Sequence, residues 1–295
     1  MRWQKTYLKE DVTLVTDTDL EIAVPRINPI SGIIIIFEIT GGGTSTMACA
    51  NEASVELIKN GHEVITSLQW GELVGIDNVL MPAAYAIADI GSGASGKQEA
   101  FIPLGRFLGD GEFFLDPRGF DALDLKIHTP TIATGGTPTY SVILVRGYPL
   151  EAVPLGYFKL STKKAYTAAA AIEYITLDRA YKYGLIALSE IDGTSVDIAS
   201  AVLGLLRLNV DAGAFYPVDL DARDLLLAGR MTYLDPDIAA LGTPLADSNM
   251  VIAQWMKPWL GEDGLLPAPD YGSLVLEATG KAAGTVRVTG MELVK

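Results

Sequence analysis

The chain has 295 residues, 49% of them hydrophobic and 20% charged, as expected of a globular protein of about two domains. Its formal net charge of −14 argues against a nucleic-acid-binding surface, which needs clustered lysine and arginine. The single cysteine, Cys49, excludes an intrachain disulfide and a cysteine-based zinc site, and no apolar run reaches the ~20 residues of a membrane-spanning helix.

The N-terminal residues combine aromatic and basic side chains on an otherwise acidic chain. Trp3 and Tyr7 are interleaved with Arg2, Lys5 and Lys9, and the first residues lack the apolar core of a signal peptide. The segment is either an ordinary exposed terminus or an arm attracted to an anionic membrane, with its rings at headgroup level. Its candidate membrane-facing residues are Arg2, Trp3, Lys5 and Lys9.

Strand patterns dominate the next part of the chain. Ile33–Ile39 is a short apolar run rich in β-branched residues, and apolar residues recur within Ser54–Ile58 and Val64–Leu68. Asn60-Gly61 lies between the last two and predicts a tight hairpin turn, because both residue types tolerate positive φ. Helical periodicity follows over Gln69–Leu80.

A long segment rich in alanine, glycine and proline, Met81–Ala100, comes after this predicted helix. Loops of that length are usually functional or face a partner, so we expect an excursion from the sheet. Strands resume at Leu123–Ile127 and Val142–Val145, and Gly147–Lys164 is the predicted linker to the second half.

The second half of the chain repeats the first at a shift of 152 residues. Gly32–Gly41 reappears as Gly184–Gly193, and Phe107–Asp110 as Trp259–Glu262. A repeat this long is the size of a whole domain, whereas solenoid units have roughly 20–50 residues. The elements expected in the second copy are strands at Leu206–Val210, Ala214–Val218, Leu274–Leu276 and Thr285–Val288, a turn at Ala212-Gly213, a helix at Asp221–Met231 and a long loop at Thr232–Asn249.

Each copy therefore contains roughly eight short strands, one helix after the central hairpin and a long loop. Sheets of many short antiparallel strands avoid open edges by closing as barrels or as two-sheet jelly rolls. The predicted fold class is all-β, with two tandem antiparallel jelly-roll barrels and a few short helices. Residues 1–150 form the N-terminal jelly roll with its N-terminal arm, and residues 151–295 form the C-terminal jelly roll.

Two glycine-rich segments resemble phosphate-binding motifs. Ile33–Gly43 followed by Ser45–Lys59 is similar to the strand, turn and helix of a dinucleotide-binding unit, but it lacks the third glycine. Gly91–Lys97 has the glycine and lysine spacing of a phosphate loop, but Gln98 replaces the serine or threonine that Mg²⁺ requires. The second copy keeps the strand and loses both glycine clusters, so both interpretations are disfavoured.

Catalytic and metal chemistry have little support in this sequence. The two histidines, His62 and His128, lie 66 positions apart, without the spacing of a metal site. Asp116, Asp121 and Asp124 could form a carboxylate pair, but the first of them begins an Asp-Pro-Arg-Gly sequence typical of a turn. We expect no enzyme activity, catalytic set, cofactor or metal.

Several stretches carry a resemblance to a known family. They are Ala53–Leu68, Phe101–Leu104 with Phe113–Phe120, and Phe215–Leu225. Together with the duplication they resemble the double jelly-roll major capsid proteins of tailless icosahedral viruses, the lineage of adenovirus hexon and membrane-containing bacteriophages. The resemblance implies a homotrimer that forms a pseudo-hexagonal tile of the virion shell, contacting neighbouring capsomers and minor capsid proteins. It also implies an internal membrane faced by the N-terminus, no direct contact with nucleic acid, and synthesis in the host cytoplasm.

The alternative is a tandem jelly-roll glycan-binding protein or glycan hydrolase. Such a protein needs convergent carboxylates or a groove of exposed tryptophan and tyrosine. Trp70, Trp255 and Trp259 instead stand in apolar surroundings, which predicts that they are buried. A Rossmann-like enzyme would require strands that alternate with helices of 10–15 residues, and this pattern is missing.

Overall fold

The computed structural model divides the chain into two compact units. One contains Met1–Ser161 with Val294–Lys295, and the other contains Thr162–Leu293. The structure describes residues 2–40, 47, 49–80, 96–132, 136–148, 153–168, 171–190, 203–221, 250–255, 261–280 and 284–295. The division falls inside a strand, Tyr157–Ala168, so the predicted linker is wrong from Tyr157 onward, where the chain is part of a sheet.

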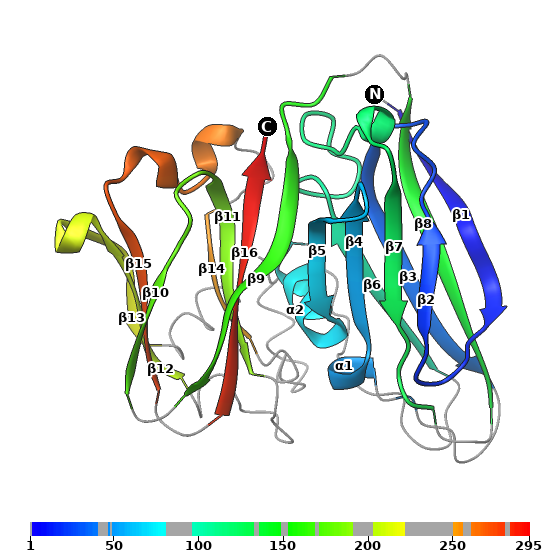
Figure 1. Ribbon diagram of the computed structural model, residues 1–295, viewed down its shortest axis with the longest axis horizontal. Helices are drawn as coiled ribbons and strands as arrows, with labels where there is room; N and C mark the ends of the chain where they lie inside the picture. Colours follow the sequence, from blue (N-terminus) through cyan, green and yellow to red (C-terminus); the bar gives the residue numbers. More distant parts are fainter. Residues whose placement is uncertain are drawn as a thin grey trace, which may run out of the picture. The chain divides into compact units, whose positions relative to one another are not determined.

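The strands of the first unit are divided between two sheets (Figure 1). They are β1 (Arg2–Thr13), β2 (Asp19–Ala23), β3 (Ile30–Thr40), β4 (Ser54–Lys59), β5 (Glu63–Gln69), β6 (Gly96–Pro103), β7 (Leu123–His128) and β8 (Thr137–Tyr148). One sheet has the order β1-β8-β3-β6, and the other contains the run β2-β7-β4-β5. The neighbours in these two orders pair antiparallel.

The strands that follow repeat this topology one for one. They are β9 (Tyr157–Ala168), β10 (Ile172–Thr176), β11 (Lys182–Glu190), β12 (Leu203–Val210), β13 (Phe215–Asp221), β14 (Met250–Gln254), β15 (Leu274–Gly280) and β16 (Gly284–Val294). They lie in the second unit, except for β9 up to Ser161 and Val294 of β16. They form the orders β9-β16-β11-β14 and β10-β15-β12-β13. Subtracting eight from each strand number gives the two orders of the first unit, so the sequence repeat is also a repeat of topology.

Helical segments in the described residues are short. They are α1 (Cys49–Glu52), α2 (Trp70–Leu80) and the 3₁₀ turns η1 (Pro117–Gly119), η2 (Asp211–Gly213), η4 (Glu262–Gly264) and η5 (Ala268–Asp270). The predicted helix Gln69–Leu80 is confirmed as α2. No helix in the described part of the chain is both long and apolar enough to cross a membrane.

The predicted turns between the central strands are confirmed in both units. Asn60 and Gly61 have φ of 54° and 75°, and all three residues of Asp211–Gly213 have positive φ. Each turn is tied to the chain that leads into the next strand of its sheet. The Asn60 side-chain oxygen accepts from the Asp121 amide at 2.7 Å, and the Asp211 carboxylate accepts from the Ser273 amide at 3.0 Å.

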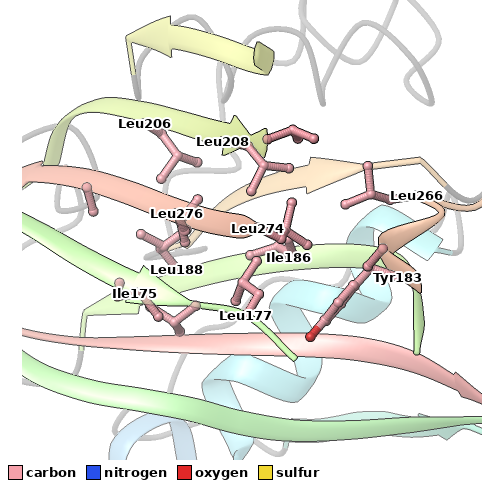
Figure 2. Close-up of a cluster of buried hydrophobic side chains, with 14 of the residues drawn as sticks. Ile175, Leu177, Tyr183, Ile186, Leu188, Leu206, Leu208, Leu266, Leu274 and Leu276 are labelled. Carbon is pink, nitrogen blue, oxygen red and sulfur yellow. The ribbon is translucent and has the colours of Figure 1, made fainter. Parts of the chain in front are cut away.

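The core of the second unit lies between its two sheets. Figure 2 shows Leu206, Leu208, Leu274 and Leu276 of one sheet facing Ile186 and Leu188 of the other. These side chains are at most 2% exposed. Their alternation along each strand is the period-two pattern of a strand with one buried face.

In the first unit, β3 is buried on both faces, which explains its unbroken apolar sequence. One of these faces carries a cluster that we call the outer cluster: Ile34, Ile36, Phe101, Ile143 and Val145, with Trp3 and Leu108 packed against it. Trp70 is fully buried, with its ring centroid 4.5 Å from that of Phe37, so its predicted burial is confirmed.

The first predicted long loop overlaps a strand of the sheet. Gly96–Ala100 belong to β6, so the predicted excursion Met81–Ala100 is too long at its C-terminal end. Pairing with β3, in which Ile39 lies opposite Gly96, holds these residues in the sheet despite their glycine and lysine content. Residues 81–95 and 222–249 lie outside the described residues, and with them nearly all of the predicted second helix and the second long loop.

Candidate interaction surface

The N-terminal segment is a strand of the sheet and not a free arm. β1 pairs antiparallel with β8 from Arg2 opposite Tyr148 to Thr13 opposite Thr139. It stands at the end of the order β1-β8-β3-β6, so among the described strands its second edge has no partner. An edge strand of this length is a template for further pairing, and its lysines and two register shifts limit non-specific pairing.

The four predicted membrane-facing residues do not share one environment. Arg2, Lys5 and Lys9 are exposed, whereas Trp3 is half-buried. Opposed residues of an antiparallel pair place their side chains on the same face, so Lys5, opposite Val145, lies on the face that carries the outer cluster. The three basic side chains are accessible to solvent, whereas Trp3 packs against this cluster.

Trp3 packs against the loop that follows β6. Its ring meets Phe114 edge-on, with centroids 5.8 Å apart and planes at 71°. A Cβ added to Gly109 would lie 3.3 Å from the Trp3 ring, and Gly109 has a φ of +86° that favours glycine. The contact joins residues more than 100 positions apart, so the sequence offered no signal for it.

That loop is held by a buried arginine. Arg106 donates to both oxygens of Asp110 at 2.8 and 2.9 Å and to Glu112 at 2.6 Å, and its guanidinium lies 4.6 Å from the Phe113 ring centroid. Burial alone would raise the pKa of Asp110, but hydrogen bonds led by those from Arg106 outweigh it and lower this pKa. Both acids are held by the arginine, so the cluster braces the loop and does not form a catalytic pair.

A cavity of about 180 Å³ adjoins the outer cluster. It is lined by Lys5, Ile34, Asp77, Glu99, Ala100, Phe101 and Leu108. Asp77 of α2 is 2% exposed and accepts from the Phe101 amide at 2.5 Å, while its other oxygen has no hydrogen-bond partner. Burial raises the pKa of Asp77 well above its usual value, the Phe101 amide opposes this, and the charge of Glu99 adds to it.

The residues considered for catalysis are not brought together. Asp116 caps η1 and pairs with Arg118 at 2.6 Å, as expected of a turn. His62 lies 2.7 Å from the Asn60 carbonyl oxygen, and His128 lies 2.8 Å from Asp19. The described residues contain no group of three or more histidine, cysteine, aspartate or glutamate side chains that could hold a metal ion.

The phosphate-binding interpretations find no support in the described residues. The dinucleotide motif needs a helix after β3, but Ser54–Lys59 of that stretch is strand β4, antiparallel to β5. Gly96 and Lys97 of the second motif belong to β6, and Lys97 lies 3.2 Å from Glu99. The remaining glycines of both motifs lie outside the described residues.

No protein-family model and no curated protein matches this sequence. Solved structures do match, over nearly their whole length. The STIV major capsid protein has a TM-score of 0.70 at 14% identity, covering 100% of this chain and 97% of its own. The major capsid protein P2 of Bacteriophage PM2 has a TM-score of 0.67 at 10% identity, with 99% and 98% covered.

The fold is the double jelly roll. A model of the PBCV-1 virus capsid agrees, with a TM-score of 0.63 at 12% identity and 99% and 93% of the two chains covered. In these terms β1–β8 form the first jelly roll and β9–β16 the second. The prediction of an all-β chain with two tandem jelly rolls and a few short helices is confirmed.

Proposed function

We propose that this chain is the major capsid protein of an icosahedral virus. The observation that carries the proposal is the match of a complete double jelly roll to capsid proteins, with at least 93% of each compared chain covered. The protein would be made in the host cytoplasm and would act in the virion. Its work would be done by interfaces, with no reaction catalysed.

The duplication supports assembly as a homotrimer. We infer that residues 1–150 and 151–295 are two domains of equivalent shape, so that three copies place six jelly rolls around a ring. A subunit with two near-equivalent domains turns threefold symmetry into approximate sixfold contacts, which suits a pseudo-hexagonal tile. Such tiles would contact neighbouring capsomers and minor capsid proteins.

The glycan-binding or glycan-hydrolysing alternative is less well supported. Asp110 and Asp116 pair with arginines, and Trp70 is buried in the first unit. Trp255 is partly buried against the second core, and Trp259 lies outside the described residues. A carboxylate pair or an aromatic groove is therefore not formed by these side chains.

The mass of the assembled protein in solution tests the proposal. Native mass spectrometry of the purified full chain should give three times the chain mass. A strictly monomeric protein that hydrolyses glycans would overturn the proposal and favour the alternative.

We further propose that the basic residues of β1 contact an internal viral membrane. Arg2, Lys5 and Lys9 are exposed, and each basic residue near an anionic surface contributes about 1 kcal/mol. Replacing all three by glutamine should therefore weaken binding to vesicles with 30% phosphatidylserine by roughly 100-fold, since about 1.4 kcal/mol is a factor of ten. Deleting residues 1–9 is a poorer test, because it removes most of a paired strand.

The matched control replaces three exposed basic residues elsewhere, Lys97, Arg118 and Lys126, by glutamine, so that both variants lose three positive charges. We expect this variant to keep most of the vesicle affinity. Equal losses in both variants would show that net charge alone determines binding, and would exclude a specific contact by β1.

A further inference from the structure

β9 is the first strand of its repeat and β5 is the fifth strand of its own, and the two form a parallel pair. β9 begins beside β5 and runs parallel to it, with Leu160 opposite Thr66 and Ser161 opposite Ser67. This contact lies within the unit Met1–Ser161. Hydrogen bonding of this kind needs only an open backbone edge on each strand, so it does not depend on particular side chains.

Because the fold is duplicated, the chain has a second strand in the fifth position, β13, and a second strand in the first position, β1. β13 occupies the place of β5 in the second jelly roll, and β1 occupies the place of β9 in the first. β13 ends the order β10-β15-β12-β13, and β1 ends the order β1-β8-β3-β6. Among the described strands, each has one edge without a neighbour.

We propose that β13 of one copy pairs in parallel with β1 of the next copy, repeating between chains the contact that β5 and β9 make within one chain. The proposal rests on the trimeric capsid function above and names the contact that closes the trimer. Such a contact joins two different surfaces and is heterologous, so it generates a closed ring when the rotation between copies is one third of a turn. Three copies would then have six equivalent first-to-fifth strand pairs.

The 152-residue repeat gives the expected register. It takes Thr66 and Ser67 of β5 to Val218 and Asp219 of β13, and Leu160 and Ser161 of β9 to Leu8 and Lys9 of β1. In this register Leu8 lies opposite Val218 and Lys9 lies opposite Asp219.

Charge favours the same partner. The first eight residues of β1 contain Arg2, Lys5 and Lys9 and no acid, whereas β13 contains Asp219 and Asp221 and no base. Opposite charges on neighbouring strands stabilise pairing, and like charges oppose it. Two β1 strands, or two β13 strands, would repel each other, so the second copy is expected to meet β1 through β13.

A disulfide between copies tests the contact directly. Paired strands hold α-carbons about 5 Å apart, within the range that a disulfide spans. The native cysteine, Cys49, is buried and stays in place. The double variant K9C/D219C should form covalent dimers and trimers on mild oxidation, seen by non-reducing electrophoresis. The control K9C/K126C places the second cysteine at Lys126, an exposed position of β7 outside the proposed contact, and should stay monomeric on the same gel.

A charge reversal provides the second test. K9E places two carboxylates opposite each other and should weaken trimerisation by up to about fivefold per contact, and D219K combined with K9E should restore it. A trimer that forms no K9C/D219C disulfide and is not weakened by K9E would overturn the strand pairing and leave the capsid function standing. A chain that stays monomeric in every variant and in the native form would overturn both.

Discussion

Truncating one core leucine in each jelly roll should loosen the unit that contains it. Leu57 of β4 and Leu208 of β12 are both 0% exposed, and each lies opposite a buried leucine, Leu125 or Leu276. A buried leucine-to-alanine change removes the transfer free energy of the lost atoms and leaves a cavity, at a cost of about 3–4 kcal/mol. For units of this size that corresponds to a fall in Tm of roughly 6–16 °C.

Hydrogen exchange with mass spectrometry separates the two units. L57A should speed exchange mainly in peptides from β4, β5 and β7, and L208A mainly in those from β12, β13 and β15. Calorimetry gives the Tm of each variant. V153A truncates an apolar side chain that is 84% exposed and should change stability by no more than about 0.5 kcal/mol. If L57A and L208A gave the same exchange pattern across both units, the inference of two separate cores would be wrong.

Three further substitutions test particular features of the first unit. Burial raises the pKa of Asp77 in the folded protein above the unfolded value of about 3.9. The contribution of this carboxyl group to the free energy of unfolding is therefore fully present below the unfolded pKa and is lost as pH rises through the folded pKa. D77N should exceed the native protein in urea midpoint at pH 8 and lose that advantage toward pH 4. A pH-independent difference would contradict this assignment. G32A places a Cβ 1.9 Å from the Phe101 ring and should cost about 1–3 kcal/mol, whereas G119A meets no atom within 4 Å; equal Tm values for the two would refute the clash. N60A loses a side-chain acceptor at a positive φ and should cost about 1–2 kcal/mol in chemical denaturation, whereas N60D keeps the acceptor and should cost less.

Local patterns in the sequence were sufficient for the secondary structure and the duplication. The apolar run in β3, the Asn60-Gly61 turn and the helix α2 each follow from residues close together in the chain. Period-two alternation and positive-φ turns are local properties of the backbone, so they can be read without knowing the fold. The 152-residue shift then made two equivalent domains the natural expectation.

The environment of the candidate site could not be read in this way. The basic residues Arg2, Lys5 and Lys9 are exposed as expected, but their strand pairs with β8, about 130 residues away. Trp3 was a candidate membrane-facing residue, yet it packs on Phe114. Asp77 and Arg106 were not singled out at all, because nothing near them in sequence shows that they are buried.

The sequence by itself determined that this chain is an all-β protein built twice from the same set of strands, because strand periodicity and turn chemistry act over a few residues. Only the tertiary structure decided which strands stand at the edges of the sheets. Edges depend on pairings between segments far apart in the chain, and both β1 and β13 keep one edge without a neighbour among the described strands. Whatever completes those edges is therefore a property of the folded molecule and its assembly.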